Sequence, residues 1–273
     1  MIRINDLGFS YGEKIVLKDI TMTLEEGRIY GLLGENGVGK TTLLTLLCGL
    51  KKVKAGSIDI DGHNPYDREP SILGDLYYLS DEVPAVNMKA KDYAENYGKF
   101  WEGFDMSKFM TVMEELDNDP QQKMNKMSFG QLKKTYIAFA LACNAKYLFM
   151  DEPTNGLDIP SKAQFRKAIM KHTREDATLL ISTHQVRDLE NIIDPIIILD
   201  KKEVLLNASI EQIADKLYFD YSNEKVENAL YSEMIPGGCI QVLPNTEKKD
   251  SKVNIEALFN TVHQHKELIK GMF

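Results

Sequence analysis

One stretch near the start of the chain has the residue types and spacing of a phosphate-binding loop. Residues 34–41 read GENGVGKT, which fits the pattern G-x-x-x-x-G-K-[ST]. Its glycines leave backbone amides open to a phosphate, and a helix that begins near Lys40 adds unpaired amides and a partial positive charge. Lys40 would reach the β- and γ-phosphates, and the Thr41 hydroxyl would bind Mg²⁺. A glycine-rich turn could match by chance, but the apolar strand before it and the apolar helix after it favour a phosphate site.

Two carboxylates follow another apolar stretch, in the sequence YLFMDEP at residues 147–153. A parallel sheet binds its ligands at the carboxyl ends of its strands, which is where Asp151 and Glu152 would lie. Asp151 would hold Mg²⁺ through water, and Glu152 would accept a proton from an attacking water, a role typically worth about 10²–10⁴-fold in rate. An acidic loop that merely ends a strand is the alternative, which the phosphate loop makes less favourable.

Three further positions allow both a structural and a functional interpretation. His184 follows the apolar stretch ATLLIST and could contact a γ-phosphate, although a lone histidine is more often structural. Tyr11 lies in a predicted surface turn, where an aromatic ring either packs or stacks on a base. Ser128 and Gln131 have the spacing of a capping box for a helix predicted over Phe129–Ala142. A small hydroxyl at a helix N-terminus is also suited to binding an anion.

The elements that must position these residues alternate between strands and helices, which predicts a mostly parallel sheet with helices on its faces. Residues 2–12, 15–24 and 56–62 read as strands that precede or flank the phosphate loop. Residues 89–117 have helical spacing with aromatic and Met anchors and predict a helical insertion. Residues 195–207 predict a final hairpin. After about residue 209 the pattern is mixed, with strands predicted at 217–222 and 238–244 and an amphipathic helix from Ile255.

Composition limits the classes of function. The chain has 273 residues, 43% of them hydrophobic and 27% charged, and a net charge of −8. These values suit a soluble globular protein and argue against general nucleic-acid binding, which depends on Lys and Arg. The three cysteines form no C-x-x-C pair, so we expect no disulfide framework or zinc site and a reducing, cytoplasmic setting. The first residues lack the apolar core of a signal peptide, and no run of about 18 apolar residues predicts a membrane span.

Six motifs in order resemble those of the ATP-binding subunits of ABC transporters: SYG, GENGVGKT, MSFGQ, LFMDEP, NGLD and STH. GENGVGKT corresponds to the Walker A motif of that family, MSFGQ to its signature, LFMDEP to Walker B, NGLD to the D-loop and STH to the switch histidine. The resemblance covers residues 1–210 and implies a P-loop NTPase fold. It further implies an N-terminal antiparallel β subdomain and a helical subdomain inserted at about residues 85–140, leaving residues 211–273 as a C-terminal α+β extension.

The resemblance also assigns roles to residues. ATP and Mg²⁺ would be the cofactors, Glu152 and His184 catalytic, and Asp158 part of the D-loop. Thr41 and Asp151 would bind the metal, with Asp81, at the position of the family's Q-loop glutamine, as a further candidate. The residues expected to bind the nucleotide are Tyr11, Gly34, Glu35, Asn36, Gly37, Val38, Gly39, Lys40, Thr41 and Thr42. The residues expected to face ATP held by a partner subunit are Ser128, Phe129, Gly130 and Gln131. The signature departs from the usual Leu-Ser-Gly-Gly-Gln at Met127 and Phe129.

The function implied is ATP hydrolysis that powers a separate integral membrane permease, with export as the expected direction because the chain most resembles ABC-2-type subunits. Its partners would be a second copy in a head-to-tail homodimer, or a related ATPase subunit, and the permease, with no nucleic acid. We expect it in the cytoplasm, peripheral on the cytoplasmic face of the membrane. One alternative is a soluble ABC-type ATPase that acts as a regulatory or mechanochemical module. Another is a nucleotide-responsive binding module without turnover.

Overall fold

A six-stranded sheet forms the centre of the computed structural model, which describes residues 1–273. Its strands lie in the order β5-β6-β7-β3-β8-β9, and all neighbours are parallel except β8 and β9. The bounds are β3 (Ile29–Leu33), β5 (Leu76–Leu79), β6 (Tyr147–Asp151), β7 (Thr178–Thr183), β8 (Ile196–Asp200) and β9 (Glu203–Ala208). Strands β6, β7 and β8 are buried along their whole length, as expected for apolar strands covered on both faces. The predicted mostly parallel sheet and its final hairpin are confirmed.

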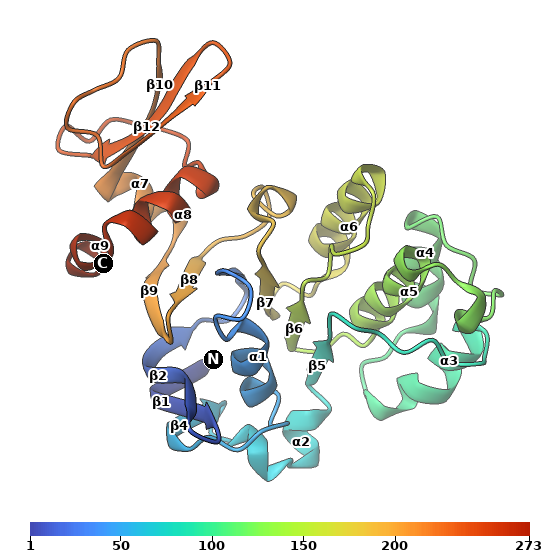
Figure 1. Ribbon diagram of the computed structural model, residues 1–273. Helices are drawn as coiled ribbons and strands as arrows, with labels where there is room; N and C mark the ends of the chain where they lie inside the picture. The colour runs from blue at the N-terminus through green and yellow to red at the C-terminus, as the bar shows by residue number, and fades with distance from the viewer.

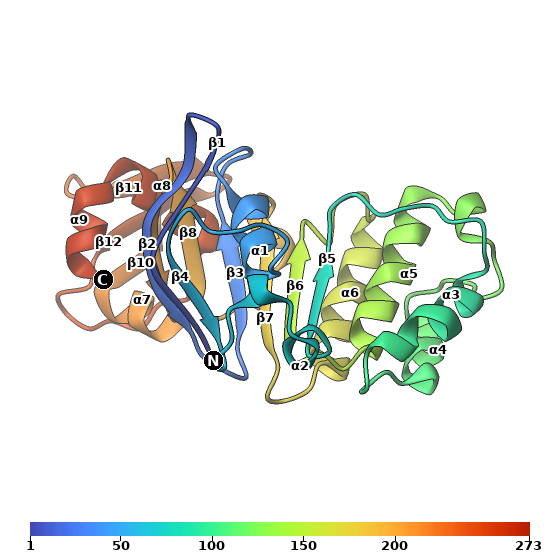
Figure 2. The same ribbon diagram turned by 90° about the horizontal axis from the view of Figure 1, so that it is seen from below.

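A second sheet covers one side of this centre. Its three antiparallel strands lie in the order β2-β1-β4, with bounds β1 (Ile2–Tyr11), β2 (Lys14–Leu24) and β4 (Ala55–Ile60). Helix α1 (Lys40–Leu47) lies between the two sheets (Figure 2). Its buried Leu43 and Leu47 belong to one hydrophobic cluster with Ile4 of β1 and Leu32 of β3. This packing fixes the start of α1 at the carboxyl end of β3.

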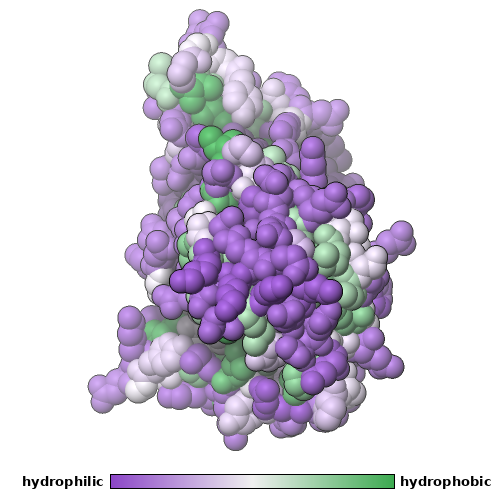
Figure 3. All heavy atoms as spheres, turned by 90° about the vertical axis from the view of Figure 1, so that its right-hand side faces the viewer, coloured by the Kyte–Doolittle hydropathy of each residue, from purple (hydrophilic) through white to green (hydrophobic).

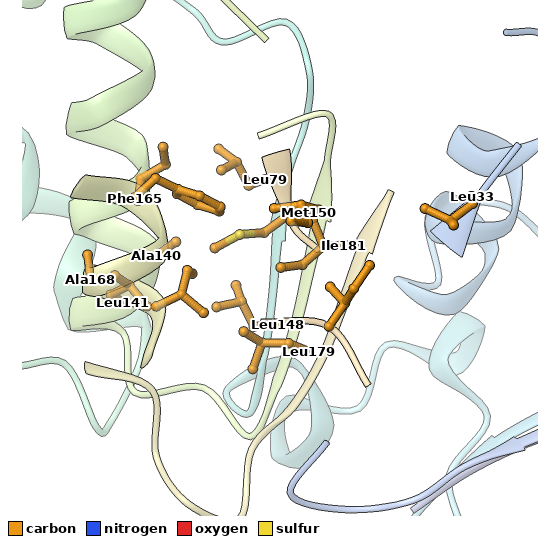
Figure 4. Close-up of a cluster of buried hydrophobic side chains, with 14 of the residues drawn as sticks. Leu33, Leu79, Ala140, Leu141, Leu148, Met150, Phe165, Ala168, Leu179 and Ile181 are labelled. Atoms are coloured by element: carbon orange, nitrogen blue, oxygen red, sulfur yellow. The ribbon is translucent and has the colours of Figure 1, made fainter. Parts of the chain in front are cut away.

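The other face of the core sheet is covered by helices α5 (Phe129–Ala142) and α6 (Ile159–His172). Figure 4 shows Phe165 of α6 and Ala140 of α5 turned toward Met150 and Ile181 on the strands. Helix α5 has the bounds that its sequence predicts, so that expectation is confirmed. Because α5 packs on the sheet along its length, its first turn is held at a defined position beside the strand ends.

A group of helices lies between β5 and β6 in the chain, at the right of Figure 1. It comprises α3 (Ala90–Tyr97), the 3₁₀ turns η2 (Gly98–Phe100) and η3 (Met124–Lys126), α4 (Met106–Glu115) and then α5. The helical pattern predicted for residues 89–117 is therefore broken. Trp101 there donates its ring N–H to the carbonyl of Leu76 (3.0 Å), and Asp105 caps the start of α4. The face that this part of the molecule presents is mostly hydrophilic, with smaller hydrophobic groups near its edges (Figure 3).

The last part of the chain forms a third unit at the far side of the core sheet from these helices (Figure 1). Antiparallel strands lie in the order β10-β12-β11, and helices pack beside them. The bounds are α7 (Ile210–Lys216), β10 (Leu217–Ser222), β11 (Tyr231–Ile235), β12 (Gly238–Pro244), α8 (Ile255–Gln264) and α9 (Lys266–Met272). The strands predicted at 217–222 and 238–244 and the helix from Ile255 are confirmed. Strand β11 is not indicated by the sequence, because apolar and polar residues do not alternate in YSEMI.

Three short elements complete the fold: η1 (Pro65–Asp67), α2 (Pro70–Leu73) and η4 (Val186–Asp188). No helix in the molecule is both long and hydrophobic enough to span a bilayer.

Candidate functional site

A cleft of about 510 Å³ lies at the carboxyl ends of the core strands, and most residues predicted to bind a nucleotide line it. The predicted residues in its wall are Tyr11, Glu35, Asn36, Gly37, Val38, Gly39, Lys40, Thr41, Thr42, Asp81, Asp151 and Glu152. The sequence did not indicate the others. They come from the start of β2, the end of β8 and the β8–β9 turn: Lys14, Ile15, Val16, Asp200, Lys201 and Lys202. Gly34 and His184 line a second cavity of about 460 Å³. The site therefore collects residues from five separate segments.

The phosphate loop has a backbone that requires glycine. Gly37 and Gly39 have φ of 80° and 120°, in the left-handed region that side chains rarely adopt. A Cβ atom on Gly34 would lie only 2.6 Å from the carbonyl oxygen of Leu199. The loop thus leads directly from β3 into α1, and its amides and the first turn of that helix lie where an anion would be favoured.

Lys40 is held inside this loop. Its Nζ donates hydrogen bonds to the carbonyls of Gly34 (2.7 Å) and Glu35 (3.2 Å) and lies 3.6 Å from Oε1 of Glu152. The side chain is only 6% exposed, and burial lowers the pKa of Lys40, while Glu152 and Asp151 act in the opposite direction. The ammonium group is therefore preorganised at the loop, with partners that a phosphate could replace.

Asp151 offers oxygen ligands beside that loop. Its Oδ2 accepts a hydrogen bond from the Thr41 hydroxyl (2.6 Å), and its Oδ1 accepts one from the Ser182 hydroxyl. Ser182 is paired with Asp151 across strands β6 and β7, a partnership that the sequence analysis missed and that only the sheet register reveals. Carboxylate and hydroxyl oxygens are the donors that Mg²⁺ prefers, so Thr41 and Asp151 fit the metal expected with ATP.

Glu152 lies between two nitrogen-bearing side chains. Its Oε1 is 2.9 Å from Nδ1 of His184 and 3.6 Å from Nζ of Lys40, and its side chain is 12% exposed. Its backbone has a φ of 45°, a conformation that typically costs about 1–3 kcal/mol for a non-glycine residue. The Glu152 N–H donates to the carbonyl of Ser182 (3.1 Å), which helps to hold this geometry. The strained turn directs the carboxylate toward the lysine of the phosphate loop, at the wall of the cleft.

Tyr11 both packs and exposes its ring. The ring meets Phe9 edge to face with 5.0 Å between centroids, and the Nζ of Lys51 lies 5.1 Å from its centroid. Its hydroxyl is 3.4 Å from the hydroxyl of Thr42, and the residue is 48% exposed. An exposed ring at the cleft wall can stack on a base, so both interpretations made from the sequence remain compatible with the structure.

The segment 128–131 lies outside the cleft. Ser128 caps α5: the Gln131 N–H donates to its hydroxyl (3.2 Å), and the Gln131 side chain accepts from the Ser128 N–H (2.9 Å). The predicted capping box is confirmed. Asp158 similarly caps α6 by accepting from the Ser161 N–H at 2.9 Å. Within a single chain these residues therefore do not contact the nucleotide cleft, and any contact with ATP would involve another subunit.

The Phe129 ring turns toward the loop that precedes α6. A Cβ atom on Gly156 would lie 2.3 Å from the ring, so the two residues are in close contact. Phe129 begins α5 without a positive φ and remains 46% exposed. Phe129 therefore needs only ordinary backbone geometry at the start of α5.

We predict that Phe129→Gly keeps ATPase activity within about tenfold, a change of roughly 1.4 kcal/mol in the barrier. The ring is half-exposed and lies on Gly156, so its loss leaves the Ser128 cap and Gly130 in place. Gly156→Ala is the informative comparison, because Gly156 has a φ of 78° and a methyl group there meets the ring. Steady-state phosphate release measures both. A loss far above tenfold in Phe129→Gly would show that the ring takes part in the signature's function.

Comparisons with known proteins agree with this geometry. The family model described as ABC transporter matches residues 17–155. The chain is 29% identical over 243 residues to the ABC transporter ATP-binding protein NatA of Bacillus subtilis, covering 85% of this chain and 96% of NatA. It is 29% identical over 214 residues to the lantibiotic transport ATP-binding protein SrtF of Streptococcus pyogenes, covering 77% and 92% of the two chains.

The fold also matches solved structures. One is a dimeric ATP-binding cassette in a post-hydrolysis state bound to ADP and Pi, with a TM-score of 0.67 at 22% identity. The match covers 77% of this chain and 98% of that one. From the family match and the shared fold, we conclude that the chain belongs to the ABC transporter family and carries its ATP-binding cassette.

Proposed function

We propose that this protein binds and hydrolyses ATP, and that the hydrolysis powers a separate transmembrane permease. The observation that carries the proposal is the position of Glu152, 3.6 Å from Lys40 and 2.9 Å from His184 at the edge of the cleft. Hydrolysis of a terminal phosphate needs a cation that binds the phosphate and a base that accepts a proton from water. Lys40 and Glu152 can supply these, and His184 lies beside the same carboxylate. A binding module without turnover would not need this base.

Each residue then has a distinct role. The loop amides and Lys40 bind the phosphates, and Tyr11 stacks on the base. Glu152 accepts the proton of the attacking water, while His184 orients the Glu152 carboxylate and contacts the terminal phosphate. Thr41 and Asp151 hold Mg²⁺, which when bound neutralises phosphate charge. A metal contact by Asp81 is a further part of this proposal.

We propose that two chains form a head-to-tail homodimer that closes on ATP. Support comes from the position of Ser128 and Gly130 outside their own chain's cleft and from the dimeric state of the solved cassette of similar fold. In the closed dimer, the first turn of α5 of one chain would face the γ-phosphate held by its partner, where helix amides favour an anion. A related ATPase subunit could take the place of the second copy.

The coupling to transport remains a proposal. Residues 1–210 would form the ATPase domain, with the helices at about 85–140 and the Asp81 loop meeting the permease on the cytoplasmic face of the membrane, and residues 211–273 would be an extension. Export is the proposed direction, supported by the resemblance to ABC-2-type subunits, and a relative named for lantibiotic transport supports the coupling to transport. A soluble ATPase that acts as a regulatory or mechanochemical module is the alternative. Identifying the membrane protein that co-purifies with the chain separates the two.

We expect Lys40→Ala to weaken MgATP binding by about 10–100-fold, because a charge-assisted hydrogen bond is worth about 1.5–3 kcal/mol. Phosphate release should fall with it. Titration calorimetry and a phosphate-release assay measure the two effects. Lys52→Ala is the matched control, because Lys52 is exposed and does not line the cleft. Unchanged affinity and turnover in Lys40→Ala would contradict the assignment of the phosphate site.

A further inference from the structure

Asp81 is one of five carboxylates that line the cleft, together with Glu35, Asp151, Glu152 and Asp200. Asp81 follows β5 and lies in the same wall. A carboxylate this close to a triphosphate repels it unless a positive charge offsets it. The resemblance to the family implies a neutral glutamine at this position. This chain therefore has a negative charge where the family pattern has none, and that charge must be offset.

The offsetting charge is buried in the helix that begins after Ser128. Lys133 of α5 has no exposed side-chain surface, and its Nζ donates to the carbonyl of Asp81 (2.6 Å) and lies 3.5 Å from Oδ1 of Asp81. It also donates to the carbonyl of Ser80 at 3.2 Å. A fully buried lysine is rare and persists when it is paired and hydrogen-bonded, as it is here.

A third segment meets the same carboxylate. Asn155, in the loop after β6, donates its side-chain N–H to Oδ1 of Asp81 at 3.1 Å. Burial lowers the pKa of Lys133, and Asp81, Asp151 and Glu152 act in the opposite direction, so the ammonium group interacts with these three carboxylates. The loop after β5, helix α5 and the loop after β6 are thus joined at one ion pair.

We propose that Lys133 is a positioning residue for nucleotide binding: its buried ammonium group cancels the charge of Asp81 and fixes the Asp81 loop to α5. This inference rests on the proposed nucleotide site. The two opposite charges of Asp81 and Lys133 sum to zero, so this wall has the same net charge that a neutral glutamine would give it. It also ties the wall of the cleft to the helix whose first turn carries the signature, so the two move together.

The test is a double-mutant cycle on MgATP affinity, measured by titration calorimetry. Lys133→Gln leaves Asp81 uncompensated, and we expect it to raise the dissociation constant about tenfold. The affinity of Asp81→Asn alone sets the reference level, and Lys133→Gln/Asp81→Asn should return to within about threefold of that reference, because the charge balance is restored. Lys134→Gln removes a neighbouring charge on the same helix and is the matched control.

A second variant tests the charge balance without altering the buried lysine. Asn155→Asp adds a carboxylate beside Asp81, so it should also weaken MgATP binding about tenfold, and Asp81→Asn should reverse the loss. Thermal unfolding establishes which variants are folded. Normal affinity in folded Lys133→Gln or in Asn155→Asp, or no recovery in the double variants, would overturn the inference. Failure of the wild type to bind MgATP would instead refute the proposed function.

Discussion

Glu152→Gln is expected to bind MgATP with near-normal affinity and to hydrolyse it at least about 10²-fold more slowly, within the range of about 10²–10⁴ that a general base typically supplies. The amide has the shape of the carboxylate but cannot accept a proton from water. The contacts with Lys40 and His184 orient the native side chain, and an amide oxygen can retain one of them. Binding and turnover should therefore separate in this variant.

The same variant should accumulate the closed dimer, because ATP that is not hydrolysed cannot reopen it. Sedimentation in MgATP measures the dimer, and single-turnover phosphate release measures the chemistry. Glu114→Gln makes the same change on the exposed side of α4 and serves as the control. Wild-type turnover in Glu152→Gln would remove Glu152 from the role of base, and a protein that stays monomeric in MgATP would count against dimer closure by this chain alone.

The phosphate loop and the sheet were predictable because local sequence determines them. GENGVGKT between an apolar strand and an apolar helix leaves few other conformations, and Gly37 and Gly39 adopt the positive φ that their residue type allows. Asp151 and Glu152 could be placed at a strand end because buried parallel strands are continuous apolar runs. Parallel topology then brings separate strand ends to one edge of the sheet.

Contacts between distant segments could not be predicted in this way. The left-handed backbone of Glu152 depends on its contact with β7, since nothing about a glutamate indicates a positive φ. The Asp81–Lys133 pair joins residues 52 positions apart, and Lys133 reads in the sequence as an ordinary helix lysine. The sequence places Asp81 at the position of a neutral glutamine and does not indicate which side chain lies beside its carboxylate.

The C-terminal extension shows the same limit. Its strands and main helix were visible in the sequence, but its attachment was not. Leu258 and Ile269 share a buried hydrophobic cluster with Leu189 and Leu205. Ion pairs such as Arg187 with Glu256 (2.6 Å) and Lys270 with Glu203 (2.7 Å) lie at the surface of this contact. Arg187 follows His184 closely, so the extension contacts the segment that carries His184. Exposed charges are compatible with many partners, and their pairing is decided only by the folded arrangement.

Gly130→Asp is expected to bind MgATP normally and to lose at least about 10²-fold in turnover, which corresponds to about 2.7 kcal/mol in the barrier. The substitution adds bulk and negative charge at the place where the partner's γ-phosphate would bind. The chain's own cleft does not include Gly130, so binding at Lys40 should survive. Gly130→Ala is the matched control, because a Cβ atom there meets the carbonyl of Gly156 at 3.0 Å without adding charge.

Mixing two inactive variants tests the head-to-tail arrangement directly. In a mixed dimer of Lys40→Ala and Gly130→Asp, one site has both defects and the other has neither. Random pairing makes half of the dimers mixed, so turnover should recover to about a quarter of the wild-type level. Mixing the wild type with an equal amount of a chain that carries both substitutions leaves no intact site in the mixed dimers, so turnover should fall to about a quarter of the wild-type level, all of it from wild-type dimers. If mixed dimers form and no activity returns, a site shared between two chains is contradicted, and MSFGQ is only the cap of helix α5.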